Sequence, residues 1–547
     1  MMRKKSKNGK AIFAAVGCFC LYFLMMLGIL NRGAGFTDES DNFIGGMVIA
    51  SGRSIYRDFA SQHMPVMYYI CAILKLLGAD SVYRFRLSFY VVLALLWTVV
   101  ALRYGKSVGR LAAMGTGALY IINMFNLYTC CVLAEQLQSV GCVILFWEIL
   151  LFARERKLDW KNNMMISLAV FLSFGSAFVS AFMIFAAVLV FLFVGIKTCV
   201  EEKTGFACGV QRLFSMFYRT AVFVIVPFVV MILVYALKGT LGDFIYGAYT
   251  VNREIYPEYM GGYGSSVLMG FLEPIRSYGQ TLTLSLRWLV EEVGLTKEYA
   301  AILRWNICFG INFLFWICYA FREGLRGQKH IGEALLLAYF TILCASRGVN
   351  TFHGLPYLAV TMAMAAWLLQ RYFNFVKQRN GWHKPQYVVA TAAIACVLFI
   401  YGANYFVACR SIMDTRQNLS TKAVEDPEQI VYWIHALTEE DETVLLTTIE
   451  PQLLVEADRI PYKTGISAPW MYRAFEEVEL ANLKKNAPRV AVYRSDYEIW
   501  GNYMRDYAPE VWQFMEENYT QLDEAKFPAL YVKNEYLDEA RKIYVAN

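Results

Sequence analysis

Long apolar runs recur along most of this 547-residue chain, and they constrain its fold more than any other feature. A helix of about 20 apolar residues crosses the hydrocarbon core of a bilayer. Since 57% of the residues are hydrophobic, we expect a polytopic α-helical membrane protein. The predicted spans are 11–30, 83–102, 111–127, 130–152, 163–179, 181–197, 220–237, 301–320, 331–346, 355–370 and 386–406. The shorter run 64–78 is expected to be either an interfacial helix or a further crossing.

Basic residues fix the predicted orientation of these eleven spans. If the N-terminus is cytoplasmic, each short cytoplasmic loop is rich in Lys and Arg, as the positive-inside rule requires. These loops are 103–110, 153–162, 198–219, 321–330 and 371–385. The start MMRKKSKNGK precedes an apolar run without a small-residue cleavage site, which is typical of an uncleaved first helix. We therefore predict a multi-pass protein of the plasma (inner) membrane with an extracytoplasmic C-terminal tail.

Three longer segments lie on the outer side in this topology. They are 31–82, the aromatic-rich segment 238–300, and the tail 407–547. The tail alternates helix-like stretches with strand-like ones such as ETVLLTTI, PRVAVYR and ALYVK. This pattern predicts a soluble α/β domain that follows a membrane module formed by 1–406. The tail has neither a GxGxxG motif nor a P-loop, so we expect no nucleotide site there, and we expect no nucleic-acid partner.

The first outer segment concentrates charge against the membrane surface. Asp38, Glu39 and Asp41 follow the first span, and Asp58 and His63 come later in the same segment. One explanation is local, because an acid at the start of a helix can accept hydrogen bonds from its free N–H groups. Capping by Asp38 does not explain the other acids or the cations that follow them, so this segment is the candidate site.

The stretch DESDNFIGGMVIASGRSIYRDFASQHMP resembles the first external loop of polyprenyl-phosphate-sugar glycosyltransferases of the GT-C superfamily, the bacterial relatives of protein O-mannosyltransferases and aminoarabinose transferases. The positions that match the pattern of that family are Asp38, Glu39, Gly52, Tyr56, Asp58, His63 and Pro65. The likeness continues more loosely through Arg86, Glu135 and RGVNTFHGLP to the tail. The family often has Lys where this chain has His63, and a Lys of the fifth span is replaced by Ser180.

This resemblance implies a fold and an activity. The implied fold is GT-C-like, with interfacial helices in the first outer loop. The implied activity moves a sugar from a polyprenyl-phosphate donor to a lipid, glycan or protein acceptor on the outer face. The sugar, the acceptor and any metal requirement are left open.

The chemistry of such a transfer assigns roles to the two leading acids. A carboxylate must take the proton of the acceptor hydroxyl as the new bond forms. Single displacement with inversion places this base opposite the departing phosphate. We therefore predict that Asp38 is the catalytic base, and that Glu39 either orients it or shares a divalent metal ion with it. Two adjacent acids are only a weak metal signal.

The departing phosphate also needs positive charge. The predicted substrate-binding residues are Asp58, His63, Arg86, Glu135, Arg347 and His353. Structural alternatives are open for four of them: Arg86 as a snorkelling anchor, Glu135 as a helix-start cap, and Arg347 and His353 as parts of an ordinary interfacial turn. Tyrosines such as Tyr68 are expected in the interfacial aromatic belt.

Two other classes of function are alternatives to the enzyme. A transporter or flippase of a lipid-linked glycan predicts charged or broken helices at mid-membrane in repeated halves. The sequence has no visible internal repeat, and its acids cluster in one outer loop, which favours the enzyme. A non-catalytic scaffold would bind partners through its tail, and Asp38 and Glu39 would then be dispensable.

Overall fold

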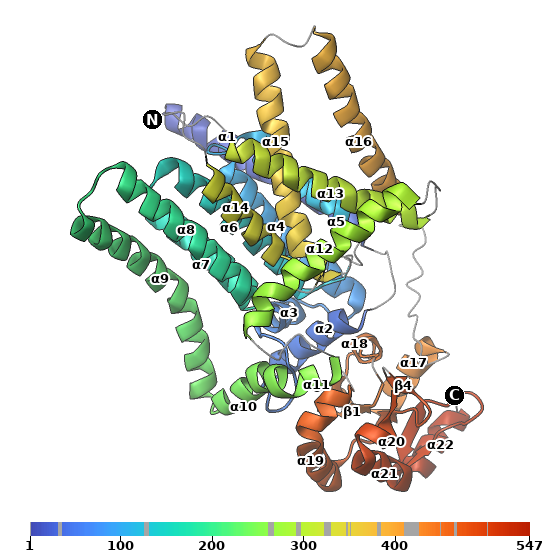
Figure 1. Cartoon of the computed structure of the whole chain (residues 1–547). Helices are drawn as coiled ribbons and strands as arrows, with labels where there is room; N and C mark the ends of the chain where they lie inside the picture. Colours follow the sequence, from blue (N-terminus) through green and yellow to red (C-terminus); the bar gives the residue numbers. More distant parts are fainter. Residues whose placement is uncertain are drawn as a thin grey trace.

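The computed structural model describes most of the chain (Figure 1). The described residues are 2–30, 36–124, 131–260, 267–291, 297–321, 330–345, 348–349, 352–379, 384–409, 426–448, 450–463, 468–499 and 501–546. Arg347, one of the predicted substrate-binding residues, lies outside them. A large helical bundle carries the N-terminus at one end, and a smaller domain with strands lies at the other end and holds the C-terminus (Figure 1).

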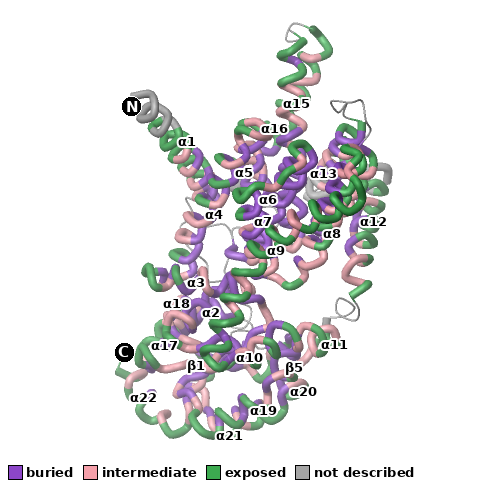
Figure 2. The backbone as a smooth tube through the Cα atoms, turned by 90° about the vertical axis from the view of Figure 1, so that its left-hand side faces the viewer, coloured by how far each residue is buried: buried purple, intermediate pink, exposed green. Residues whose placement is uncertain are grey.

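Each predicted span coincides with a helix of the bundle. These helices are α1 (Met2–Leu27), α4 (Val82–Tyr104), α5 (Arg110–Met124), α6 (Ala134–Glu155), α7 (Trp160–Phe174), α8 (Ser180–Glu201), α9 (Phe206–Leu237), α13 (Lys297–Ala320), α14 (Ile331–Leu343), α15 (Leu355–Gln378) and α16 (Pro385–Cys409). Among the described residues, six helices are long and apolar enough to cross a membrane. The most apolar window is wholly buried in α6 but only 6% buried in α9 and in α16 (Figure 2). The prediction of a multi-pass helical membrane protein is confirmed, and α6 is its central helix.

The segment 31–82, which was predicted to be the first outer segment, contains two short helices, α2 (Thr37–Ala50) and α3 (Val66–Leu76). Glycines allow these helices to pack closely, because a Cβ at Gly45 would lie 2.3 Å from the Tyr68 ring and one at Gly46 would lie 2.5 Å from Cys71. At 1.5 Å per residue, α3 is about 16 Å long, roughly half the thickness of the hydrocarbon core. The run 64–78 therefore forms a short helix that does not span the bilayer by itself.

The aromatic-rich segment is helical too, which its composition alone did not predict. It contains α10 (Leu241–Ile245), the π-helix η2 (Tyr246–Ile255), α11 (Tyr256–Met260) and α12 (Val267–Glu291). Its tyrosines pack against the C-terminal domain: the rings of Tyr246 and Phe475 lie 5.4 Å apart, and those of Tyr256 and Trp470 lie 5.0 Å apart. This segment therefore joins the bundle to the C-terminal domain.

The C-terminal domain has the predicted α/β character. Its elements are α17 (Pro427–Leu437), β1 (Thr443–Leu446), α18 (Gln452–Glu456), β2 (Ile460–Pro461), α19 (Pro469–Asn486), β3 (Val490–Val492), β4 (Glu498–Ile499), β5 (Asn502–Tyr503), α20 (Met504–Tyr507), α21 (Pro509–Asn518), β6 (Tyr519–Gln521), β7 (Leu530–Lys533) and α22 (Leu537–Ala546). The main sheet has the order β2-β1-β3-β7-β6. β1 is parallel to both of its neighbours, and β3, β7 and β6 pair antiparallel.

Polar contacts hold this domain against the first outer segment. Lys75 Nζ lies 2.6 Å from Asp458 Oδ1, and the N–H of Val82 donates to Glu456 Oε1 at 3.0 Å. The N–H of Ala60 donates to the carbonyl oxygen of Lys463 at 2.7 Å. The C-terminal domain thus contacts α3, the start of α4 and the loop between α2 and α3.

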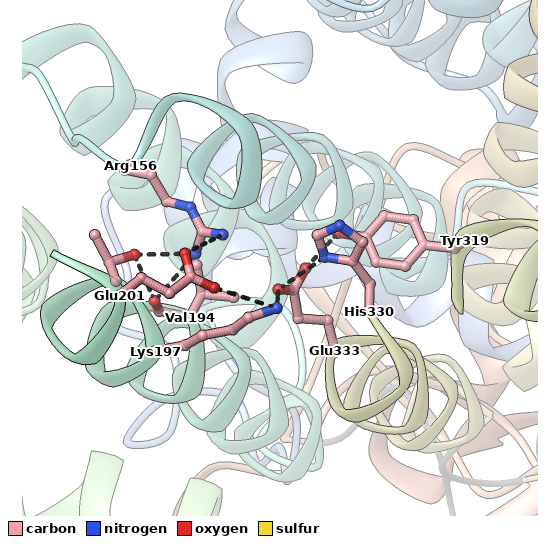
Figure 3. Close-up of polar contacts among 8 residues, drawn as sticks. Arg156, Val194, Lys197, Glu201, Tyr319, His330 and Glu333 are labelled. Carbon is pink, nitrogen blue, oxygen red and sulfur yellow. Dashed lines mark hydrogen bonds and ion pairs between the residues drawn. The ribbon is translucent and has the colours of Figure 1, made fainter. Parts of the chain in front are cut away.

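The opposite end of the bundle contains a chain of paired charges (Figure 3). Lys197 Nζ of α8 lies 2.9 Å from Glu333 Oε1 of α14 and 3.8 Å from Glu201. His330 Nδ1 lies 3.1 Å from Glu333 Oε1. The hydroxyl of Tyr319 donates a hydrogen bond to Glu333 Oε2 at 3.0 Å. Since Glu333 is only 1% exposed, these partners compensate its burial, and together they tie α8, α13 and α14 to one another.

Candidate active site

Asp38 lies in the first turn of α2. That helix begins at Thr37, with Phe36 as the N-cap residue and no side-chain cap hydrogen bond. The helix dipole favours a negative charge at this position. Among the residues that the structure describes, no hydrogen bond or ion pair reaches the side chain of Asp38. Asp38 therefore does not serve as the N-cap of α2.

The surroundings of Asp38 favour its protonated form. Burial raises the pKa of the Asp38 carboxyl above its ordinary value, and the nearby carboxylates of Glu135 and Asp41 raise it further. His63 and His353 act in the opposite direction, but the net shift is upward. These four neighbours form two pairs, His63 with Asp41 and His353 with Glu135. Of the three acids, Asp38 is therefore the one without a histidine partner among the described residues.

The first pair joins α2 to the loop before α3. His63 Nδ1 lies 3.2 Å from Asp41 Oδ2, and the hydroxyl of Tyr68 donates to the same oxygen at 2.6 Å. The hydroxyl of Tyr56 donates to the carbonyl oxygen of His63 at 2.6 Å, which holds the backbone of the loop. Tyr68 is fully buried, so it positions Asp41 rather than lying in an aromatic belt. No sequence pattern indicated this role.

The second pair joins residues far apart in the sequence. His353 Nδ1, in the 3-10 turn η3 (Phe352–Gly354), lies 2.7 Å from Glu135 Oε1 at the start of α6. The ring of Phe352 packs edge-on against Phe36, with 5.3 Å between centroids, which brings this turn next to the start of α2. Two predicted substrate-binding residues thus lie together beside Asp38. Their binding of substrate stays a prediction.

Glu39 and Arg86 form a buried ion pair. Arg86 Nε donates to Glu39 Oε1 at 2.7 Å and Nη2 donates to Oε2 at 2.6 Å. The N–H of Val132 also donates to Oε1, at 2.7 Å. Glu39 is 0% exposed and Arg86 is 1% exposed, so this two-pronged contact neutralises both charges inside the protein. The geometry gives Arg86 a carboxylate partner, which neither the phosphate-binding nor the anchoring hypothesis included.

The surroundings of Glu39 do not suit the predicted divalent ion. Both of its oxygens accept hydrogen bonds from Arg86 and Val132, and a bound cation would have to lie against the guanidinium. Among the described residues, no group of three or more His, Cys, Asp or Glu side chains is arranged to hold a metal ion. Nor does Glu39 donate or accept any hydrogen bond that would orient Asp38 within the described part of the chain.

The hydrogen bonds and the ion pair of Asp58 stay within its own loop, between α2 and α3. It accepts the N–H of Ser54 at 2.7 Å, and Arg57 Nε lies 3.1 Å from its other oxygen. Burial would raise the pKa of Asp58, but the hydrogen bonds from Arg57 and Ser54 lower it overall. These contacts close the turn that precedes His63, and the predicted substrate contact of Asp58 stays a prediction.

The fold and this site together define a multi-pass membrane protein with a carboxylate-rich site at one end of the bundle, next to a small α/β domain. No protein-family model and no curated protein matches the chain. Among solved structures, it is similar to ArnT from Cupriavidus metallidurans in the apo state, with TM-score 0.52 and 12% identity over 96% of this chain and 98% of that one. It is also similar to the same ArnT bound to undecaprenyl phosphate, with TM-score 0.48 and 14% identity over 88% and 93%. The chain therefore shares its overall fold with apo ArnT, which confirms the expected fold of many membrane helices followed by a small C-terminal domain.

Proposed function

We propose that this chain is a membrane glycosyltransferase that moves a sugar from a polyprenyl-phosphate donor to an acceptor hydroxyl on the outer face. The observation that carries the proposal is Asp38, a carboxyl group of raised pKa beside two histidine–carboxylate pairs and without a polar partner of its own among the described residues. The likeness of the fold to apo ArnT supports this class of enzyme. The resemblance of the first outer loop supports the polyprenyl-phosphate donor.

In the proposed reaction Asp38 takes the proton of the acceptor hydroxyl. The hydroxyl oxygen forms a bond to the anomeric carbon while the bond from that carbon to the phosphate oxygen breaks. The phosphate leaves with the bonding electrons on the face opposite Asp38, so the configuration at the anomeric carbon inverts. A raised carboxyl pKa makes Asp38 a stronger base than an ordinary aspartate, and it remains ionised at pH values above that pKa.

We propose that His63 and His353 stabilise the departing phosphate. Each ring is oriented by a carboxylate, Asp41 or Glu135, through its Nδ1 atom. Such a pairing fixes the ring and lets the imidazole donate or hold charge. We do not propose Arg86 as a phosphate contact, because it neutralises Glu39. Arg347 remains a candidate phosphate contact on the basis of its sequence position alone. No metal ion is given a step in this mechanism.

The alternative function, a flippase of a lipid-linked glycan, differs in one chemical outcome. Purified protein in proteoliposomes is supplied with polyprenyl-phosphate sugars and a mixture of acceptor lipids, and the lipids are analysed by mass spectrometry. The enzyme consumes the donor and releases polyprenyl phosphate in an amount equal to the new glycoside. A flippase moves the donor between leaflets without changing its mass, and that result would contradict the proposal.

We propose a topology in which the N-terminus is cytoplasmic and the α/β domain is extracytoplasmic. The short basic loops support it through the positive-inside rule. Lys106 and Ser495 are on opposite sides in this topology. Single cysteines placed there, in a chain whose native cysteines are replaced, should react with an impermeant thiol reagent from opposite sides of the membrane. Labelling from one side only would overturn the topology.

A further inference from the structure

A large cavity lies among five helices of the bundle. Its volume is about 940 Å³, and residues of α5, α6, α13, α15 and α16 line it. It is separate from Asp38 and its neighbours, none of which lines it. The volume is at the upper end of the range of pockets that bind small molecules.

The lining changes from polar to apolar along the cavity. Ser107, Arg154, Gln370, Arg371, Asn374 and Gln378 line one end, near the ends of α6 and α15 and the start of α5. Most of the remaining lining is apolar, as at Ile311, Leu314, Met362, Val397 and Leu398. A ligand that fits this arrangement has a polar, negatively charged head and a hydrocarbon tail.

The cavity is open to the bilayer. Leu314, Phe375 and Leu398 line it and are exposed, so a lipid can enter sideways between α13 and α16. Along α15 the lining extends from Met362 to Gln378, which at 1.5 Å per residue is about 24 Å. One leaflet of a bilayer, with its headgroups, is about 20 Å thick. The groove thus matches a single lipid of one leaflet.

Two arginines supply the charge at the polar end. The guanidinium of Arg371 lies 4.7 Å from the ring centroid of Trp367, which keeps it at the rim. Arg154 donates to the carbonyl oxygen of Ser107, and its Nη2 lies 2.7 Å from Glu155. Glu155 offsets part of the Arg154 charge, so we expect Arg154 to contribute less than a full charge beside Arg371, which also lines this end. The neighbouring loops 103–110, 153–162 and 371–385 are also basic.

We infer that this groove binds an anionic phospholipid, with its phosphate at Arg371 and Arg154 and its acyl chains along α13, α15 and α16. The donor lipid is a poorer fit, because its phosphate must lie at the Asp38 end to react, whereas the charged end of this groove lies at the opposite end of the bundle (Figure 1). One basic residue near the membrane surface favours an anionic lipid by about fivefold. Arg154, partly offset by Glu155, adds a smaller factor of about two, so we expect phosphatidylglycerol to bind about tenfold more tightly than phosphatidylcholine.

The test uses the detergent-purified full chain, titrated with phosphatidylglycerol or phosphatidylcholine of identical acyl chains and followed by native mass spectrometry. The wild type should prefer phosphatidylglycerol about tenfold, and Arg371→Gln should lose most of this preference. Arg379→Gln is the matched control, because Arg379 follows the end of α15 but does not line the groove. If Arg371→Gln cannot be purified, Gln378→Glu takes its place. It puts a negative charge at the polar end and should weaken phosphatidylglycerol binding.

Three results would overturn the inference. One is equal binding of the two phospholipids by the wild type. Another is an Arg379→Gln loss as large as that of Arg371→Gln, which would indicate nonspecific attraction. The third is undecaprenyl phosphate displacing phosphatidylglycerol in wild type and in Asp38→Asn alike, which would make the groove a donor-lipid site.

Discussion

The two ends of the bundle use the same kinds of residue in different ways. At the end away from the C-terminal domain, Glu333 is buried with Lys197, His330 and Tyr319 around it. At the other end, Asp38 lies beside two histidine–carboxylate pairs, with no polar partner among the described residues. Charges with a complete set of partners stabilise the fold. An acid without such partners lowers the free energy of unfolding, and its carboxylate is available to react with a substrate.

Free energies support this distinction. Removing one partner of a buried ion pair costs about 3–5 kcal/mol, because the other charge is left buried and unpaired. Asp38 is in a milder form of this situation, since it is partly exposed, burial and neighbouring acids raise its pKa, and no described side chain pairs with it. The folded chain holds the proton of Asp38 to a higher pH than the unfolded chain does, so this group lowers stability as the pH rises through that interval. We infer that the cost is retained because the carboxylate is needed for transfer.

The comparison predicts its largest effect at Arg86. Arg86→Leu should destabilise the protein by about 3–5 kcal/mol, because it leaves Glu39 buried without its cation. Thermal unfolding in detergent measures this loss. Arg84→Leu is the control: Arg84 is exposed and paired with Asp80, so it should change stability by less than about 1 kcal/mol. A stable Arg86→Leu protein with weakened donor binding would instead indicate a phosphate contact.

The next effect is expected at His353. His353→Gln removes a group that can carry positive charge beside Asp38, and we expect turnover to fall by about tenfold to a hundredfold. Initial rates of polyprenyl phosphate release measure it. His435→Gln on α17 is a suitable control, because His435 is exposed in the C-terminal domain and should leave the rate unchanged. A wild-type rate in His353→Gln would remove this histidine from the mechanism.

The pH dependence of transfer should follow Asp38. Below the raised pKa of Asp38, the base is protonated and kcat/KM should fall about tenfold per pH unit. The acid limb of the profile should therefore lie above the ordinary aspartate value of about 3.9. A rate that stays constant down to that value would mean either that the Asp38 pKa is not raised or that another group is the base.

The smallest effect is expected where the C-terminal domain contacts α3. Lys75 and Asp458 are partly exposed, with side chains 23% and 40% accessible, and such pairs contribute about 0.2–1 kcal/mol. Lys75→Met should lower stability by no more than that and leave turnover close to wild type. A large loss of turnover in this variant would show that docking of the domain controls the site.

Sequence alone predicted the elements that depend on local composition. The spans were visible because hydropathy accumulates within each helix, and β1, β3 and β7 were visible as short apolar strands. The pairing of Glu39 with Arg86 was not predicted, since 47 residues separate them and each had a local explanation. The α12 helix was missed because its aromatic-rich surroundings gave no clear apolar run. The role of Tyr68 depends on a hydroxyl contact to Asp41 that only the fold creates.

The most direct test makes the same kind of substitution at both ends and measures turnover and thermal unfolding together. Asp38→Asn should reduce turnover by about a hundredfold or more, with a melting temperature equal to or above wild type, because it removes a partly buried acid that has no polar partner among the described residues. Glu333→Gln should lower the melting temperature clearly, since it breaks a buried network, while the folded fraction turns over at nearly the normal rate. An Asp38→Asn protein that transfers sugar at the wild-type rate would contradict the account.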